Sequence, residues 1–363
     1  MKLKYPKFSL FLSILIAINL TCSPVMYAAP TIPTVADYTK AKNLKQFQNL
    51  VNVAVTNLQP SITLNVPKAT LTQYSEQLKG LIGINSYQIT RISKPTTTIL
   101  TITFDYKQAY KIGQYLKNPN LSSRLNNCDK NLLSLAKSIV AKVTTPNMTP
   151  YQKEVALHNY IVNTTSYDYD NLAKNTLPDS AYTAYGVLVN KKAVCEGYSE
   201  ATKLLLNLAG IECEIVTGSS NTSTAHAWNA VKLDDQWYML DTTFDDPVSF
   251  QNGQRTETLI YDYFNVTNTV LAKDHTWDHS KFPSATATKY NYYVVSGNIV
   301  NSYNEFKNYI ISKIQDGQSQ IVCYVNNYSP TTYDLSFILD YYKGQIKYSA
   351  PNTSSGSFTL YLS

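Results

Sequence analysis

The chain has few cysteines, little net charge and no long hydrophobic run. Only 5 of its 363 residues are cysteine, too few for a scaffold built on disulfides. A formal net charge of +6 is too mild for a nucleic-acid-binding protein. The most apolar run, from Phe8 to Leu20, is shorter than the roughly 20 residues that a membrane-spanning helix needs. The length is sufficient for one core domain and two smaller ones.

The first 29 residues have the composition of a secretory signal peptide. Three lysines precede the apolar run, and a short segment ending in Tyr27-Ala28-Ala29 follows it. We expect cleavage after Ala28 or Ala29. Lipidation of Cys22 is the alternative, although no small residue stands just before it. Removal of the leader takes away three lysines and no acid, so the net charge falls from +6 to about +3. We therefore expect a secreted or cell-envelope protein that is not held in a membrane.

A buried helix is predicted to begin at Cys195. By helical periodicity Tyr198, Thr202 and Leu205 fall near the face of Cys195, and Gly210 marks the end of the helix. A cysteine in the first turn lies beside unpaired backbone N–H groups and the positive end of the helix dipole, which favour a thiolate. The same N–H groups could bind an oxyanion.

Two strands further along bring a histidine and an aspartate together. The strand-like runs 226–233 and 236–243 are separated by Asp234-Asp235, which predicts a hairpin with a two-residue loop. This register places His226 opposite Thr243, with Asp241 one diagonal step away on the same face. A shift by one residue would put the two side chains on opposite faces.

Each of these residues has a plain alternative role when it is taken alone. A lone cysteine is more often a small core residue, a lone histidine is often structural, and an aspartate commonly ends a strand. In this order and on these elements, however, Cys195, His226 and Asp241 are the types needed for a thiol nucleophile, its base and the group that orients the base.

Three motifs together resemble the transglutaminase-like superfamily, and more narrowly its secreted bacterial branch. They are Ala193-Val-Cys-Glu-Gly-Tyr, His226-Ala-Trp-Asn and Leu240-Asp-Thr-Thr, within a similarity that extends from roughly Asn126 to Pro283. Much of the family has glycine where this chain has Ala193. The resemblance implies an α+β, papain-like core, in which a helix carrying cysteine packs on an antiparallel sheet. It also implies a catalytic triad of Cys195, His226 and Asp241.

The resemblance further implies acyl transfer from an amide through a thioester on Cys195. Water as the acceptor gives a cysteine protease or deamidase, whereas an amine gives a transglutaminase. We favour hydrolysis slightly, because an exported enzyme has water in excess. The expected substrates are extracellular or cell-envelope proteins or peptides, and nucleic acid is not expected as a partner. The alternative is a cell-surface binding or assembly module with a vestigial triad.

Several aromatic residues are candidates for substrate binding. Tyr182 and Tyr185 precede the nucleophile at a spacing that would let one hydroxyl assist the oxyanion or line the acyl site, although packing is the commoner role. Trp228 shares the face of His226 and could form a wall of the cleft, with core packing as the equal alternative. Cys213 and His158 have the surroundings of structural residues.

No cofactor or metal is expected from the sequence. The segment Asp274-His-Thr-Trp-Asp-His279 offers two imidazoles and two carboxylates, so a metal site is conceivable. Its surroundings favour a structural closing segment, however, and the His-Glu-x-x-His motif of zinc proteases is absent. The calcium requirement of animal relatives is not carried over, because no Asp-x-Asp-x-Asp-Gly loop occurs.

The catalytic segment, 126–285, is flanked by two smaller segments, 30–125 and 286–363, that look like copies of each other. Each is expected to form an αβαββ domain, and their shared pattern indicates an internal duplication, with chance periodicity as the alternative. A shift of 259 residues aligns eight positions without a gap: Phe47, Val51, Val55, Ile62, Leu64, Val66, Tyr74 and Leu78 fall on Phe306, Ile310, Ile314, Ile321, Cys323, Val325, Tyr333 and Phe337.

Overall fold

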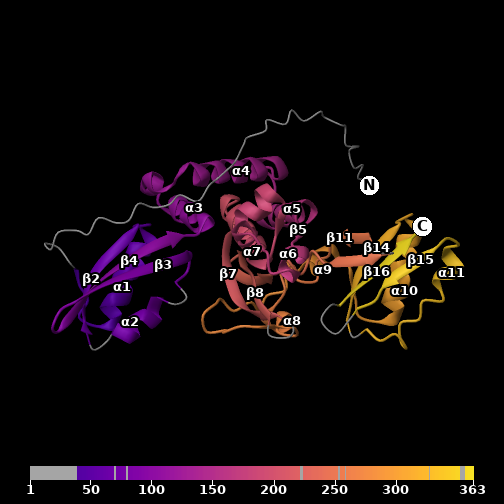
Figure 1. Cartoon of the computed structure of the whole chain (residues 1–363). Helices are drawn as coiled ribbons and strands as arrows, with labels where there is room; N and C mark the ends of the chain where they lie inside the picture. Colours follow the sequence, from indigo (N-terminus) through magenta and orange to yellow (C-terminus); the bar gives the residue numbers. More distant parts are fainter. Residues whose placement is uncertain are drawn as a thin grey trace. The chain divides into compact units, whose positions relative to one another are not determined.

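The structure is a computed structural model, whose helices and strands are shown in Figure 1. Its described residues form four hydrophobic clusters, two in the central part of the chain and one in each flanking segment. The signal-peptide prediction, 1–29, lies outside the described residues. None of the helices in the described part of the chain combines the length and the apolarity needed to cross a bilayer. The structure describes residues 39–68, 71–78, 81–220, 224–251, 254–257, 259–326, 328–351 and 356–363.

The central core contains one helix packed on an antiparallel sheet. The sheet has the order β12-β7-β8-β9, formed by His275–Thr276, Glu212–Ser220, Thr224–Leu233 and Gln236–Leu240. Helix α7, Cys195–Leu208, packs on β7 and β8. This is the predicted α+β arrangement, in which a helix that begins at the cysteine lies on an antiparallel sheet.

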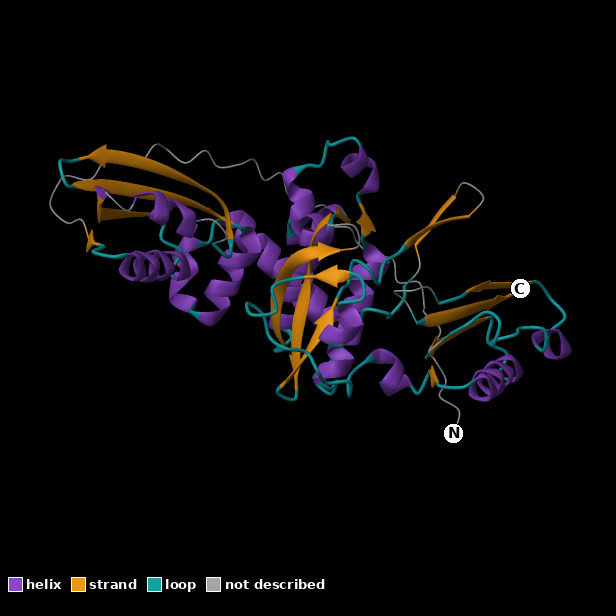
Figure 2. Ribbon diagram, turned by 90° about the horizontal axis from the view of Figure 1, so that it is seen from below, coloured by secondary structure: helices purple, strands orange, loops and turns teal. Residues whose placement is uncertain are grey.

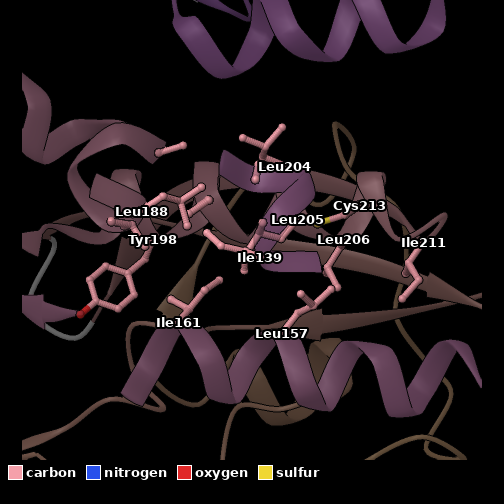
Figure 3. Packing of buried hydrophobic residues seen from close by; sticks show 14 of the residues in the cluster. Ile139, Leu157, Ile161, Leu188, Tyr198, Leu204, Leu205, Leu206, Ile211 and Cys213 are labelled. Atoms are coloured by element: carbon pink, nitrogen blue, oxygen red, sulfur yellow. The ribbon is translucent and has the colours of Figure 1, made fainter. Parts of the chain in front are cut away.

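Two long helices pack against α7. They are α4, Asn127–Val143, and α5, Pro150–Thr164, and each begins with a capping box that satisfies the first backbone N–H groups. Figure 3 shows Leu157 of α5 among the buried side chains of this cluster, with Leu205 of α7. Each buried leucine stabilises the fold by about 1.5–3 kcal/mol, so the apolar faces of these helices hold α7 in place.

Short elements connect these layers. Two of them, β5 (Ser166–Tyr167) and β6 (Lys192–Ala193), matter for the site. They form a parallel pair, and β6 directly precedes α7. The further elements of this part of the chain are α3 (Gln108–Lys117), the 3-10 helices η2 (Pro119–Arg124) and η3 (Asp179–Tyr182), α6 (Tyr169–Ala173), the π-helix η4 (Gly186–Asn190), β10 (Val248–Gln251), β11 (Gln254–Glu257), α8 (Asn268–Leu271) and α9 (Tyr292–Ser296).

The first flanking segment contains a four-stranded sheet with the order β1-β2-β4-β3. The pair β1–β2 is parallel, and the other two pairs are antiparallel. Its helices lie on one face of the sheet, as Figure 2 shows. The elements are β1 (Thr39–Lys40), α1 (Leu44–Thr56), β2 (Ser61–Pro67), α2 (Leu71–Leu78), β3 (Ile84–Ser93) and β4 (Thr97–Tyr106).

The second flanking segment repeats this topology with the order β13-β14-β16-β15 and the same strand directions. The register agrees as well, because the pair Lys40 and Asn65 corresponds, after a shift of 259, to the pair Ile299 and Tyr324. An internal duplication predicts this agreement. The elements are β13 (Ile299–Val300), α10 (Tyr303–Gln315), β14 (Gln320–Val325), α11 (Ile338–Tyr341), β15 (Ile346–Ser349) and β16 (Ser357–Leu362).

One element of the second copy differs from the sequence prediction. Residues 330–337, which align with α2, form turns and bends instead of a helix. Asp334 accepts a hydrogen bond from the backbone N–H of Ser336, and this local turn competes with helix formation. Tyr333 and Phe337 are nevertheless buried, as their counterparts in the first copy are. The apolar pattern is therefore preserved without the helix.

A buried acid on α5 should make folding sensitive to pH. Burial raises the pKa of Glu154 to about 8, although its hydrogen bond from Asn265 opposes that shift. An unfolded glutamate titrates near 4.3, so the wild-type chain should lose stability as pH rises from about 4.3 to 8. We expect Glu154→Gln to gain stability relative to the wild type between pH 5 and 8, as measured by urea denaturation. Asp235→Asn, at an exposed carboxylate, should show no such trend. A pH-independent difference for Glu154→Gln would contradict the prediction.

Candidate active site

The start of α7 exposes its backbone donors. Val194 is the N-cap residue and provides no side-chain hydrogen bond, in contrast to the capping boxes of α4 and α5. No side chain of the N-cap residue therefore competes for the N–H groups of the first turn, which lie beside the Cys195 thiol. Gly197 permits a close approach here, since a Cβ atom would lie 2.6 Å from the backbone oxygen of Ala181. The half-buried Cys195 thus lies at a crowded and uncapped helix end.

The hairpin that carries the other two residues has the predicted register. Leu233 pairs with Gln236, and Asp234 and Asp235 have positive φ angles of 47° and 59°, as a two-residue turn of this type requires. The predicted length of the second strand is wrong, because β9 ends at Leu240 rather than at Thr243. The chain leaves the sheet here because Asp241 forms a turn of its own.

That turn fixes the carboxylate of Asp241. Its Oδ1 accepts hydrogen bonds from the backbone N–H groups of Thr243 and Phe244, at 2.9 and 3.1 Å. Its Oδ2 is left for side chains and lies 2.6 Å from Nε2 of His226. The aspartate is fully buried and the histidine is 8% exposed. The backbone around Asp241 therefore determines the direction in which its second oxygen points.

The histidine also contacts the thiol, so the structure brings the three predicted residues together. Cys195 lies close enough to His226 to contribute to the raised pKa of the imidazole. Because Nε2 faces Asp241, Nδ1 is the ring nitrogen that remains for Cys195. The order is thiol, imidazole, carboxylate, which is the geometry of an activated nucleophile, its base and the residue that orients the base.

The electrostatics of the pair favour a charged imidazole. Burial by itself would lower the pKa of His226, but the charge and hydrogen bond of Asp241, together with contact to Cys195, raise that pKa to about 10. Burial likewise opposes ionisation of Asp241, but His226 and His275 outweigh it and hold its pKa well below the usual range. The site therefore stabilises an imidazolium beside the thiol.

Tyr167 is a site residue that the sequence argument missed. The parallel pairing of β5 with β6 places Tyr167 beside Ala193, two residues before Cys195. Its phenol forms a hydrogen bond with the backbone of Cys195. Burial, followed by the nearby Cys195, raises the pKa of Tyr167, so the phenol keeps its proton and can donate it in a hydrogen bond. The adjoining ion pair between Asp168 and Lys192, at 3.0 Å, links the same two segments.

The aromatic residues proposed from sequence for substrate binding are placed differently. Trp228 is only 1% exposed and lies against His226, with ring centroids 5.8 Å apart, so it supports the imidazole instead of forming a wall of the cleft. Tyr185 is half-buried at the start of η4 and does not line the cavity beside His226. Tyr182 is 40% exposed. Their spacing in the sequence could not show these directions.

The two histidines of the Asp274–His279 segment, which was considered as a metal site, have different neighbours. His275 pairs with β7 through β12, and its Nε2 lies 3.0 Å from Oδ2 of Asp241. Its Nδ1 lies 2.6 Å from Asp274, which also accepts a hydrogen bond from Tyr263. His279 instead stacks on Trp277. The four polar residues of the segment therefore do not form one cluster.

A different set of donors has metal-like spacing, but its chemistry fits hydrogen bonding better. One donor atom from each of His226, Asp241 and His275 lies within 4.8 Å of the others. Both ring nitrogens of His275 face carboxylates, and Oδ2 of Asp241 faces two imidazoles. A metal ion would have to replace protons that these contacts require. The donor set therefore fits a proton-linked cluster.

A cavity of about 650 Å³ lies beside this cluster. Tyr167 and His226 line it, so it reaches the two groups that flank Cys195. Phe244 and Tyr263 add aromatic surface, and Lys347 on β15 adds a cation. Its volume is in the range of small-molecule and peptide side-chain sites.

Comparison with known proteins identifies a family that resembles the central part of the chain. The family model of the transglutaminase-like superfamily matches residues 137–242, which include Cys195, His226 and Asp241. Residues 137–242 form a transglutaminase-like domain. The described part of this domain has the mixed helix and sheet content of an α+β fold.

Similarity to individual proteins is distant. Kyphoscoliosis peptidase from Homo sapiens is 22% identical over 198 residues, 51% of this chain and 28% of the human protein. The Mus musculus protein of the same name is 24% identical over 127 residues, 32% of this chain and 19% of its own length. The chain therefore spans less than a third of either relative.

Two solved structures show weak overall similarity. One is described as a TGase, with 20% identity, a TM-score of 0.30 and coverage of 57% of this chain and 59% of that one. The other, described as a candidate cysteine protease from Cytophaga hutchinsonii, has 14% identity, a TM-score of 0.27 and coverage of 45% and 67%. These scores are too low to support a comparison of detailed geometry.

The reactivity of the thiols gives a first test of the transglutaminase-like site. Among the described residues Cys195, Cys213 and Cys323 carry free thiols, whereas Cys128 is disulfide-bonded. Burial raises the pKa of Cys323 to about 12 and also raises that of Cys213. We expect iodoacetamide to alkylate Cys195 at least roughly tenfold faster than either buried thiol. Mass mapping of the labelled peptides measures the rates, and equal labelling of all three would contradict an activated Cys195.

Proposed function

We propose that this chain is a secreted thiol enzyme that acts on amide bonds of extracellular or cell-envelope proteins or peptides through a thioester on Cys195. The observation that carries the proposal is the continuous contact from Cys195 through His226 to the fully buried Asp241. A single buried histidine has many uses, but this order of thiol, imidazole and carboxylate matches the requirements of nucleophilic acyl transfer.

The first chemical step would form the thioester. The sulfur of Cys195 attacks the amide carbonyl as a thiolate, after its proton has passed to Nδ1 of His226. The imidazolium then gives a proton to the leaving amine as the bond from carbon to nitrogen breaks. Asp241 keeps Nε2 protonated and stabilises the imidazolium, which agrees with the raised pKa of His226.

Two donors are available for the oxyanion of that step. The backbone N–H of Cys195 lies at the uncapped start of α7, and the protonated phenol of Tyr167 is in contact with the same backbone. Donors that are already in place when negative charge develops on the carbonyl oxygen are worth several kcal/mol, of the order of 3 kcal/mol each in comparable enzymes. We assign Tyr167, in place of Tyr182 or Tyr185, as the candidate side-chain donor.

The acceptor of the acyl group determines the class of the enzyme. If water attacks the thioester, Cys195 is regenerated and the substrate is cleaved or deamidated. If an amine attacks it, Cys195 is regenerated and a new amide bond forms. We favour hydrolysis, because Lys347 contributes a positive charge to the cavity that contains His226. A cationic amine acceptor would be repelled there. The name of the human and mouse relatives, peptidase, points the same way.

The proposed location outside the cell depends on the first 29 residues. Their three lysines, apolar run and closing Ala28-Ala29 have the order of an export signal. After cleavage the chain would carry a net charge of about +3 and act on protein or peptide substrates at or beyond the cell surface.

Product analysis tests the function. The full chain is incubated with casein, a glutamine-containing protein, and a fluorescent amine, and the products are identified by mass spectrometry. We expect cleavage or deamidation to exceed amine incorporation, and Cys195→Ala to abolish both without loss of the fold.

Cys323→Ala provides the matched control, because it removes a buried thiol far along the sequence from the triad. It should keep the activity. Predominant amine incorporation would overturn the preference for hydrolysis. Activity that survives in Cys195→Ala would overturn the thioester mechanism, and a folded wild type without any reaction would favour the binding-module alternative.

A further inference from the structure

His275 has no part in the mechanism above, yet it contacts the triad directly. Its side chain is fully buried. The ring of Trp228 packs edge-on against it with centroids 5.0 Å apart, and the centroid of the Phe244 ring is 4.7 Å away. The ring centroid of His226 is 5.3 Å away. His275 therefore lies in the second layer of the site, behind Asp241, where no substrate can reach it.

The two carboxylates beside His275 determine its protonation state. Nε2 lies 3.0 Å from Oδ2 of Asp241, and Nδ1 lies 2.6 Å from Oδ1 of Asp274. Ionised carboxylates only accept hydrogen bonds, whereas a neutral imidazole has one N–H donor and one bare nitrogen. Both contacts can be hydrogen bonds only if the three side chains, His275, Asp241 and Asp274, together hold one more proton than a neutral imidazole carries.

The surroundings favour that proton on the imidazole. The titratable groups that face His275 are the carboxylates of Asp241 and Asp274, the phenol of Tyr263 and the ring of His226. Burial alone would lower the pKa of His275, but the two carboxylates outweigh burial and raise it. Tyr263 also donates a hydrogen bond to Asp274 at 2.6 Å, which stabilises the ionised form of that acid.

The backbone is built to admit His275 at this place. Strand β12 pairs with β7, with His275 opposite Ser220 and Thr276 opposite Ser219. Gly218 on β7 leaves room for this pairing, because a Cβ atom there would lie 2.2 Å from the backbone oxygen of Thr276. A glycine is thus required for the segment that carries His275 to approach the sheet.

We propose that His275 is a positioning residue, a buried cation held between Asp241 and Asp274 that fixes Asp241 toward His226 and reduces the affinity of His226 for its proton. The first effect is geometric, because the Nε2–H of His275 and that of His226 share one carboxylate oxygen. The second effect is electrostatic, because a cation beside Asp241 offsets part of the charge that holds a proton on His226. When the proton is held less tightly on the His226 imidazolium, it passes more readily to the leaving amine.

The consequence for catalysis rests on the proposed function, but the charge state can be tested without any substrate. The chain has 4 histidines, so nitrogen-15 spectra of histidine-labelled full-length protein can be assigned with single variants. We expect His275 to show two protonated ring nitrogens at pH 7 and to keep them to at least about pH 8, above the ordinary histidine range near 6.5. A neutral ring at pH 7 would overturn the proposal.

The effect on the triad is tested with His275→Gln, whose amide can still donate to Asp241 but carries no charge. We expect the pKa of His226, followed in the same spectra, to rise by about one pH unit, because charges about 5 Å apart interact by that much or more in a protein interior. An unchanged titration of His226 would overturn the proposal. Asp274→Asn is a second variant, and it should lower the pKa of His275 because one of the two carboxylates loses its charge.

A matched control separates this role from general stability. His158 is another buried histidine paired with an aspartate, Asp245, at 3.1 Å. His158→Gln should reduce the free energy of unfolding but leave the titration of His226 unchanged.

In an active enzyme His275→Gln should lower kcat with KM nearly unchanged, because the residue does not touch substrate. If the chain shows no turnover, the proposed function fails while the spectra still decide the charge of His275. If turnover is present and His275 is neutral, only the present proposal fails.

Discussion

The buried carboxylate of Asp241 is the group around which the site is organised. A charge in a protein interior is unfavourable unless hydrogen bonds and opposite charge compensate for it. Here both oxygens are satisfied, Oδ1 by the backbone N–H groups of Thr243 and Phe244 and Oδ2 by His226 and His275. Because these partners come from β8, from β12 and from the turn after β9, the aspartate links three elements of the sheet. The orientation of His226 toward Cys195 depends on this arrangement.

The rest of the core supplies the other half of the site. Helix α7 is fixed by apolar packing against α4 and α5, and its first residue is Cys195, the proposed nucleophile. The short parallel pair of β5 and β6 then sets Tyr167 beside the backbone of Cys195. Buried acids paired with tyrosine hydroxyls stabilise the surrounding loops, since Tyr198 donates to Asp246 and Tyr293 donates to Asp262. Asp262 also accepts from Ser357, which ties the C-terminal sheet to this region.

Much of this arrangement could be predicted from local patterns. The helix at Cys195 follows from periodicity and a glycine stop, and the hairpin register follows from the Asp234-Asp235 turn, because each signal lies within a few residues of its consequence. Tyr167 and His275 could not be placed in the same way. Both lie on two-residue strands whose positions are determined by pairing with distant partners, β6 and β7. The only available signal was the polar composition of the Asp274–His279 segment, which we interpreted as a structural closing segment.

The failed predictions have physical causes of the same kind. Trp228 alternates with its neighbours as a cleft residue would, but a second layer formed by Trp277 and His275 covers it. The segment 330–337, which aligns with α2, has the correct apolar spacing, yet Asp334 favours a turn, so the same side chains reach the core along a different backbone path. Periodicity thus predicted which residues are buried better than it predicted the backbone that buries them.

The central claim is that Asp241, acting through His226, makes Cys195 a nucleophile. The most direct measurement is the rate of Cys195 alkylation by iodoacetamide at pH 6 in the wild type and in Asp241→Asn, with Asp245→Asn as a control at a buried acid of the same loop. The account predicts a rate at least about tenfold lower in Asp241→Asn, because the imidazolium beside the thiolate is lost, and little change in Asp245→Asn. Equal rates in the wild type and in folded Asp241→Asn would contradict it.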